Sequence, residues 1–439
     1  MPQLTTEGVQ QRKSALKSGS MTNGHTAKQA PITTSDLDTD HPLGPPQHSA
    51  FVQFLRIIGF GSYFLTSCLF IHFAQLLGAP LYFINRDYFD TWMALTKSYF
   101  GILVTTMTSW FSPTVIRISG DASMRDLIHQ DAAGLLRMEL GERVVLMANH
   151  QLYTDWLYLW WISYTNTPPT HGHVYIILKE SLKYVPIIGP AMQFFGFVFM
   201  ARKWSSDQER MRFRLQKLSE KKEGGSPDPM YLLIFPEGTN ISANTRRQSE
   251  EYCAKQSALY PDQPPMQSLR HQILPRSTGL QFCLNELGDT IEYLYDCTIA
   301  YEGIPPGQYG QDIFTLRSVY FQGRPPKSVN MHFRRIPIST IPLGDKDEMY
   351  AWTLARWREK DDLLEAFYKT GKFPASTDAV KIEGGPQEKA WKTAYINTEV
   401  KPRSPVEFLQ IFAPVAAAAT VGRVGVQILD RVFGMGSLI

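Results

Sequence analysis

The chain has 439 residues, of which 44% are hydrophobic and 12% aromatic, and its formal net charge is +3 at pH 7. This apolar content exceeds what one small soluble domain needs and favours a protein with a membrane-embedded part. Because basic residues are scattered among acidic ones, the charge pattern argues against a nucleic-acid partner. The four cysteines, Cys68, Cys253, Cys283 and Cys297, show neither metal-ligand spacing nor a disulfide pattern, which indicates a reducing, cytosol-facing compartment.

The first part of the chain changes from polar to strongly apolar. Residues 1–50 contain no Phe, Tyr or Trp, so we expect a disordered polar tail there. Residues 57–85 contain no Asp, Glu, Lys or Arg, a length that exceeds the roughly 20 residues needed to span a bilayer. We predict a span over residues 57–77, followed by a bend at Gly78-Ala79-Pro80.

A second apolar run, residues 99–115, is about 17 residues long, which is short for a span, and it contains several threonines and serines. We expect it to lie in the membrane interface. Residues 51–118 are therefore predicted to form a unit of N-terminal membrane helices.

Residues 119–371 alternate apolar strand-like runs with helical patterns, which is typical of an α/β sheet. We expect strands at residues 143–148, 174–178, 198–201, 231–235, 291–300 and 329–333. The clearest helices are predicted from Ser206 to Leu218 and from Asp345 to Gly371.

The remaining residues are predicted to form a linker and a membrane-associated segment. Residues 372–404 are rich in Gly, Pro, Lys and Glu with little periodicity, which predicts a linker. The last segment, residues 405–439, contains an apolar, alanine-rich run at residues 408–421. Arg423 limits this run to about 14 residues. We therefore expect this C-terminal segment to lie on the membrane surface or to insert partly.

A histidine and a carboxylate five positions apart follow the first predicted strand, in the stretch Asn149-His150-Gln151-Leu152-Tyr153-Thr154-Asp155. If Asp155 lies in the first turn of the next helix, its carboxylate can hold one imidazole nitrogen of His150 and leave the other free for a substrate hydroxyl. Taken alone, such a pair is more often structural than catalytic.

Two later strands also end in polar residues. The second block is the short apolar strand Gly196-Phe197-Val198-Phe199-Met200-Ala201, which leads to Arg202. The third is the strand at residues 231–235, which leads into Phe235-Pro236-Glu237-Gly238-Thr239-Asn240. A further segment, Leu274-Pro275-Arg276-Ser277-Thr278-Gly279, follows. In an α/β fold such loops collect at the carboxyl ends of the strands, where ligands bind.

These four blocks, in this order, resemble the glycerolipid acyltransferases of the lysophosphatidic acid acyltransferase type, over roughly residues 120–370. The residues of the first and third blocks are more similar to those of the eukaryotic branch that contains the lysocardiolipin and lysophosphatidylinositol acyltransferases. The resemblance implies an α/β domain with a mixed sheet flanked by helices, two N-terminal membrane helices in a hairpin, and a C-terminal membrane-associated helix. It also implies acyl-CoA as co-substrate, with no other cofactor. One departure is Asn240, where many members that use lysophosphatidic acid carry arginine, so the acceptor headgroup stays open.

The chemistry of acyl transfer assigns roles to these residues. A thioester is already activated, so what the reaction needs is a base for the acceptor hydroxyl; we expect His150 to be that base, oriented by Asp155. Arg202 is the best candidate for holding a phosphate, and Arg276 is second. Glu237, with Gly238, Thr239 and Asn240, is implied to bind the acceptor, although Glu237 could instead form a structural salt bridge. Backbone amides near Gly238 or at residues 275–279 are candidate donors to the oxyanion.

The sequence also bears on a metal site, a serine lipase, a transacylase and a lipid-binding protein. His171 and His173 lack an accompanying acidic ligand pattern, so we expect no metal site. The chain has no Gly-x-Ser-x-Gly of a serine lipase. A CoA-independent phospholipid transacylase with the same His-Asp pair remains an alternative, as does a non-catalytic lipid-binding membrane protein, against which the intact His150 and Asp155 argue. The sequence does not identify protein partners.

The expected location is the endoplasmic reticulum membrane with the catalytic domain facing the cytosol, and the alternative is a mitochondrial membrane. Asn240-Ile241-Ser242 would be an N-glycosylation acceptor in the lumen, inside the expected site. A cytosolic face avoids this modification and gives access to acyl-CoA.

Overall fold

The structure is a computed structural model that describes residues 41–201, 204–222, 225–383 and 391–433. The chain divides into two units, residues 1–45 and 46–439. Residues 1–40 fall outside the described residues, so most of the predicted tail stays a prediction. The elements described below belong to the second unit.

The second unit contains an eight-stranded mixed sheet in the order β12-β1-β9-β8-β4-β7-β5-β6. Its strands are β1 (Val115–Gly120), β4 (Arg143–Ala148), β5 (Val174–Lys179), β6 (Val198–Met200), β7 (Met230–Ile234), β8 (Tyr293–Tyr301), β9 (Ser328–Pro337) and β12 (Tyr395–Glu399). Strands β4 to β8 are parallel, so their carboxyl ends lie at one edge of the sheet. Strand β9 is antiparallel to β8. All six predicted strands are present, and the α/β fold class is confirmed.

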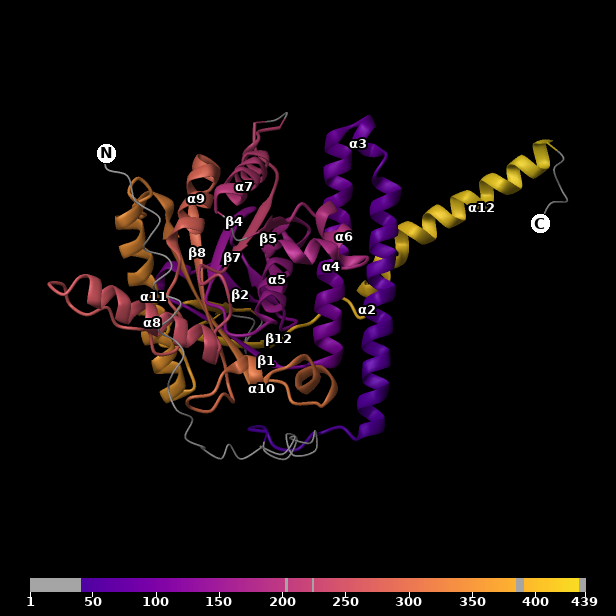
Figure 1. Cartoon of the computed structure of the whole chain (residues 1–439). Coiled ribbons are helices and arrows are strands. Elements are labelled where there is room, and N and C mark those ends of the chain that lie inside the picture. Colours follow the sequence, from indigo (N-terminus) through magenta and orange to yellow (C-terminus); the bar gives the residue numbers. More distant parts are fainter. Residues whose placement is uncertain (1–40, 202–203, 223–224, 384–390, 434–439) are drawn as a thin grey trace, which may run out of the picture. The chain divides into compact units, whose positions relative to one another are not determined.

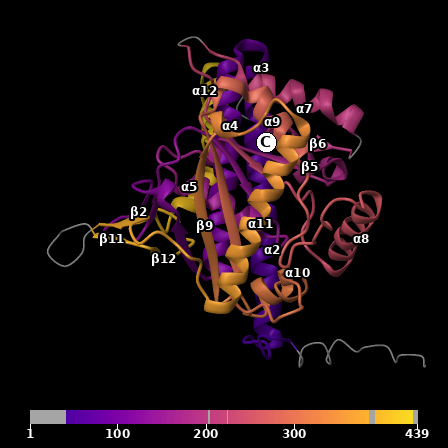
Figure 2. The same cartoon turned by 90° about the vertical axis from the view of Figure 1, so that its left-hand side faces the viewer.

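Helices cover both faces of the sheet (Figure 1). On one face lie α7 (Trp204–Ser219), α9 (Ser277–Leu287) and α11 (Lys346–Thr370). Their apolar side chains form a buried cluster with Val145 and Met147, which point to this face because side chains alternate along a strand. Figure 2 looks onto this face, along which α11 runs. On the other face lies α5 (Asp155–Thr165), which contacts helix α4.

Both predicted helices of this domain are present, with one shifted boundary. Helix α7 begins at Trp204, two residues before the predicted Ser206. Helix α11 begins after Asp345, whose side chain caps it, and ends at Gly371 with a left-handed φ of 75°. The remaining helices of this domain are α8 (Ala243–Leu259) and the short α6 (Ile188–Phe194) and α10 (Gly310–Ile313).

The N-terminal helices form a hairpin. Helix α2 (Ala50–Gly78) ends at the predicted Gly-Ala-Pro bend, and the short α3 (Leu81–Ile84) leads into α4 (Arg86–Phe111). At one end of the hairpin the Trp92 indole N–H donates to the Ala74 carbonyl oxygen over 2.7 Å. At the other end the Arg56 guanidinium donates to the Phe111 carbonyl oxygen over 2.6 Å. These bonds hold α2 and α4 side by side, as Figure 1 shows.

The expectation that residues 99–115 lie in the membrane interface is wrong. Most of this segment belongs to α4, and its residues from Gly101 to Thr108 are all buried within the protein. Helix α4 packs against α2 on one side and against α5 on another. The small and hydroxylated side chains that made the run look interfacial suit close packing between helices instead.

The linker predicted for residues 372–404 is also wrong. Residues 380–382 form β10 (Val380–Ile382), which pairs with β11 (Trp391–Thr393) and β2 (Ile128–Gln130) in a second sheet completed by β3 (Leu136–Met138). Strand β12 then joins the main sheet beside β1. These strands are short, and their stability comes from pairing with residues far away in the sequence. A local pattern of Gly, Pro and charged residues does not reveal such pairing.

The C-terminal helix is longer than expected. After a 3₁₀ turn, Glu407–Phe412, helix α12 (Ala413–Phe433) continues past Arg423, so Arg423 does not end the helix, and surface or partial insertion of this segment stays a prediction. Within the described part of the chain, two helical segments are long and apolar enough to cross a membrane, by length and composition alone: Ala50–Ile84 and Glu407–Arg431. Together they indicate membrane association.

Candidate active site

His150 and Asp155 lie together at the carboxyl end of β4. His150 follows the strand by two residues, and Asp155 is the first residue of α5. The imidazole Nδ1 lies 2.9 Å from Asp155 Oδ2. The carboxylate is fully buried, whereas the histidine side chain is 20% exposed. The pair therefore presents an imidazole at the protein surface and holds it from inside.

Hydrogen-bond donors surround the Asp155 carboxylate. Besides His150, its Oδ2 accepts from the backbone N–H groups of Gln151 (2.7 Å) and Leu152 (3.0 Å). Its Oδ1 accepts from the hydroxyl of Tyr301, at the end of β8. Because all these groups donate, the carboxylate acts as an acceptor and the proton of the pair sits on Nδ1 of His150. The other ring nitrogen, Nε2, is left to accept a proton.

Glu237 connects the third motif to the first. Its Oε1 accepts from the backbone N–H of His150 over 3.2 Å and from the Trp357 indole N–H over 3.3 Å. The side chain is only 2% exposed, and burial raises the pKa of its carboxyl to about 8. No Lys, Arg or His among the described residues lies within ion-pair distance of the Glu237 carboxyl. The described residues therefore show no structural salt bridge at Glu237.

The loop after β7 makes further contacts with His150. The Phe235 ring stacks on the imidazole with 4.3 Å between ring centroids, and the His150 carbonyl oxygen accepts from the Ile241 N–H over 3.0 Å. Asn240 donates from its side-chain amide to the side chain of Gln311. Thr239 is half-buried in the same loop. The first and third motifs thus form one structural unit around the imidazole.

Gly238 is the residue at which this loop turns. Its φ of 72° lies in the left-handed region, where a side chain is strained. Its N–H donates to the Phe235 carbonyl oxygen over 2.9 Å. The turn therefore already uses the Gly238 amide, and oxyanion donors near Gly238 or at residues 275–279 stay a prediction.

The fourth motif docks on the third. The Arg276 N–H donates to the Pro236 carbonyl oxygen over 2.8 Å. The Arg276 side chain is exposed, and its Cδ lies 4.0 Å from where a Cβ on Gly238 would stand. Among the described residues, none forms an ion pair with its guanidinium, which is thus available to an anion. The other candidate, Arg202, lies outside the described residues.

Comparison with known sequences agrees with this arrangement. The profile of the Acyltransferase family matches residues 121–302, and that of the Acyltransferase C-terminus family matches residues 320–400. An uncharacterized acyltransferase of Schizosaccharomyces pombe is 37% identical over 352 residues, covering 80% of this chain and 91% of the relative. The chain belongs to the glycerolipid acyltransferase family. It is an O-acyltransferase, as the names of its relatives indicate.

Two further relatives of this acyltransferase carry more specific names. The 2-acyl-1-lysophosphatidylinositol acyltransferase of Saccharomyces cerevisiae is 33% identical over 363 residues, covering 73% of this chain and 87% of the relative. Lysocardiolipin acyltransferase 1 of Gallus gallus is 34% identical over 238 residues, covering 53% of this chain and 56% of the relative.

Three residues of the acyltransferase site were not identified from the sequence. The Asn149 side chain donates to and accepts from the backbone of Ile299, over 3.0 and 2.8 Å, and so fixes the end of β4 to β8. Tyr301 and Trp357 supply the hydrogen bonds to Asp155 and Glu237. The sequence could have pointed to Asn149, since this residue directly precedes His150. No local pattern points to Tyr301 or Trp357, because both lie about 150 to 200 residues after His150 in the sequence.

Proposed function

We propose that this acyltransferase moves a fatty acyl chain from acyl-CoA to a free hydroxyl of an anionic lysophospholipid. One observation carries the proposal: the buried Asp155 carboxylate holds Nδ1 of a partly exposed His150 and leaves Nε2 free. A base held in this way suits a reaction that must activate an alcohol.

The proposed reaction takes two proton transfers and one exchange of bonds at the acyl carbon. Nε2 of His150 removes the proton from the acceptor hydroxyl as the oxygen attacks the thioester carbonyl carbon. The carbon–sulfur bond then breaks, and the imidazolium returns the proton to the departing CoA sulfur. The products are an ester and a free thiol, so no acyl-enzyme forms. Asp155 stabilises the transient imidazolium, as the carboxylate does in a serine hydrolase triad.

The rigidity of the imidazole follows from its surroundings. Its ring is held by Asp155 at Nδ1 and by the Phe235 ring on one face. Its backbone is held by Glu237 at the N–H and by Ile241 at the carbonyl. Proton transfer gains from such positioning, because a base that is already oriented loses little freedom in the transition state. Glu237 acts here as a positioning residue.

The acceptor is proposed to be lysophosphatidic acid, lysophosphatidylinositol or a similar anionic lysophospholipid. Arg276 supports an anionic headgroup, because its exposed guanidinium has no ion-pair partner among the described residues and lies beside Gly238. Thr239 and Asn240 offer polar groups in the same loop. The names of the yeast and chicken relatives, which refer to lysophosphatidylinositol and lysocardiolipin, favour the same class.

The proposed location is the endoplasmic reticulum membrane, with a mitochondrial membrane as the alternative. The apolar segment Ala50–Ile84 would anchor the protein, and the catalytic domain would face the cytosol, where acyl-CoA is found. In that orientation the acceptor sequence Asn240-Ile241-Ser242 escapes glycosylation.

The test is an acyl-transfer assay with detergent-purified protein. Labelled oleoyl-CoA is offered to lysophosphatidic acid, lysophosphatidylinositol, lysocardiolipin and the zwitterionic lysophosphatidylcholine. The proposal predicts CoA-dependent product with at least one anionic acceptor and little with lysophosphatidylcholine. Product formed only from a labelled phospholipid donor without CoA would identify a transacylase instead. No product with either donor would favour a lipid-binding protein without activity.

A further inference from the structure

A cavity lies at the edge of the sheet opposite to His150. Its volume is about 890 Å³, and its lining includes Tyr175 near the amino end of β5, Gly196 just before β6 and Asp228 just before β7. His150 and Glu237 instead follow the carboxyl ends of β4 and β7. A five-residue strand is about 16 Å long, so the two sites are separated by at least the length of β7. Among the residues of the four motifs, only Gly196, which begins the second motif, lines this cavity.

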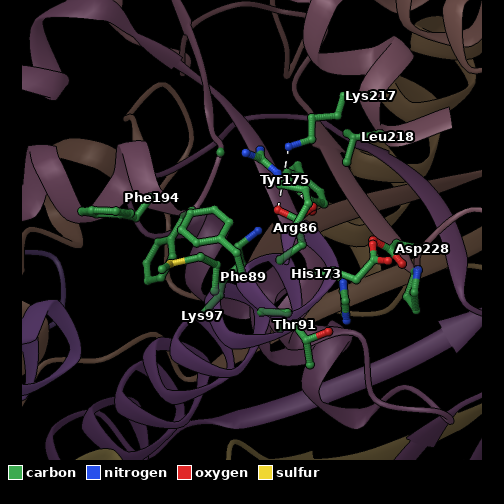
Figure 3. A pocket seen from close by; sticks show the side chains of 18 of the residues that line it. Arg86, Phe89, Thr91, Lys97, His173, Tyr175, Phe194, Lys217, Leu218 and Asp228 are labelled. Carbon is green, nitrogen blue, oxygen red and sulfur yellow. Dashed lines mark ion pairs between the residues drawn. The ribbon is translucent and has the colours of Figure 1, made fainter. Parts of the chain in front are cut away.

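Basic side chains outnumber acidic ones in the mixed wall of this cavity, six to four, and Figure 3 labels Arg86, Lys97 and Lys217 among them. The basic residues are Arg86, Lys97, Arg214, Lys217, Lys221 and Lys222. Most of the acidic residues of the wall are already engaged. Asp90 pairs with Arg86 (3.5 Å) and Lys217 (3.7 Å).

A second group of ion pairs, centred on Lys222, lies in another part of the cavity wall. Lys222 lies 2.7 Å from Asp87 and 2.8 Å from Asp228. Lys97 and Arg214, in contrast, have no ion-pair partner among the described residues. The cavity therefore contains two basic groups without an ion pair of their own, and the Asp90 carboxylate acts on both of them only at longer range.

Lys97 is the more unusual of these two groups. It lies on α4 with only 2% of its surface exposed, and no described residue accepts a hydrogen bond from its ammonium group. Its Nζ lies 3.7 Å from the centroid of the Tyr175 ring. Burial, with the nearby charge of Arg214, holds the pKa of Lys97 well below its ordinary value. A buried ammonium group without a counter-ion is destabilising, and a bound anion would relieve that cost.

The cavity also adjoins an apolar tip of the helical hairpin. Tyr82 and Phe89 line the cavity. Next to them in the sequence, Phe83 is 88% exposed and Ile84 is 74% exposed. Exposed apolar side chains at a turn that follows a candidate membrane span suit contact with lipid. The wall of the cavity therefore adjoins residues that could contact lipid.

We propose that this cavity binds the phosphate group of an anionic ligand between Lys97 and Arg214, apart from the site of acyl transfer. A phosphate offers several acceptor oxygens, which suits an ammonium and a guanidinium on facing elements, α4 and α7. The volume leaves room for the organic part of the ligand against Tyr82, Phe89 and Tyr175. The same chemistry is offered by a lipid headgroup entering beside α3 and by a soluble phosphate compound.

The experiment is isothermal titration calorimetry on the detergent-purified full-length chain at constant ionic strength. The two probes are inorganic phosphate and dioctanoyl phosphatidic acid, titrated without acyl-CoA so that no transfer occurs. The cavity variants are Lys97→Met, which keeps the length of the side chain, and Arg214→Gln. The matched control is Lys346→Met, which changes an exposed lysine at the start of α11.

We expect at least one probe to bind, and each cavity variant to weaken a phosphate-dependent site about tenfold or more, the effect of losing one charged hydrogen bond. Binding of both probes points to a soluble source, and binding of the lipid alone points to a headgroup. Because the lipid can also occupy the acyl-transfer site, the decisive quantity is the binding lost in the cavity variants and kept in Lys346→Met. Unchanged binding in both cavity variants, equal loss in the control, or no binding of either probe would overturn the proposal.

Discussion

The variant Glu237→Gln tests whether the loop around His150 holds a neutral carboxyl. Burial raises the pKa of Glu237 from 4.5 to about 8. Between these two values the unfolded chain releases the proton while the folded protein keeps it, so the free energy of unfolding falls as the pH rises through this window. Glutamine has no such proton and keeps the oxygen that accepts from His150 and Trp357.

The magnitude follows from the two pKa values. Each pKa unit corresponds to about 1.36 kcal/mol. The free energy of unfolding of the wild type therefore falls by about 5 kcal/mol relative to that of Glu237→Gln between pH 4.5 and pH 8. The unfolding entropy of a chain of this length, on the order of 0.9 kcal/mol per kelvin, converts this to a Tm difference of about 5 °C. The two proteins should melt together near pH 4.5 and diverge towards pH 8, with the variant higher.

Thermal unfolding in detergent, followed by intrinsic fluorescence from pH 4.5 to 8.5, measures this difference. The control is Glu251→Gln on α8, where the carboxyl is 69% exposed and no pH-dependent difference is expected. A Tm difference for Glu237→Gln that stays constant across the range, or that favours the wild type at pH 8, would refute a neutral buried carboxyl.

Three further variants test other parts of the site. Tyr301→Phe removes a donor to Asp155, so the carboxylate holds His150 less firmly and kcat should fall about tenfold or more with little change in KM for either substrate; a KM increase at unchanged kcat would contradict this positioning role. Arg276→Gln should raise KM for the anionic lysophospholipid about tenfold with little change in KM for acyl-CoA, and equal changes in both would argue against headgroup binding. Gly238→Ala should destabilise the protein by about 1–2 kcal/mol because of its positive φ, and a Tm at or above that of wild type would contradict this.

The sheet was predictable because its strands carry strong local patterns. Strand β4 occupies the predicted residues 143–148, and each of the other five predicted strands lies within three residues of its expected start. The approach of His150 to Asp155 was also predictable, since a strand followed by a helix allows few arrangements of residues five apart. Patterns of this kind are local and survive in any α/β context.

Other features depend on packing between distant segments. Residues 99–115 look like an interfacial segment because their hydrophobicity does not say whether lipid or protein surrounds them, and the structure surrounds them with protein. Strands β10 and β12 lie in a region without periodicity, and they pair with β2 and β1, more than 200 residues earlier, while β11 pairs with β10. The contacts of Tyr301 and Trp357 with the site arise in the same way.

The most direct test of the account is the acyl-transfer rate of His150→Ala. The variant is compared with wild type and with His129→Ala, which changes a half-buried histidine in the second sheet. Loss of a general base predicts that kcat/KM falls by about 10² to 10⁴ in His150→Ala, with Tm and membrane attachment unchanged, while His129→Ala keeps its activity. If His150→Ala retained most of its activity, His150 would not be the base and the proposed mechanism would be contradicted.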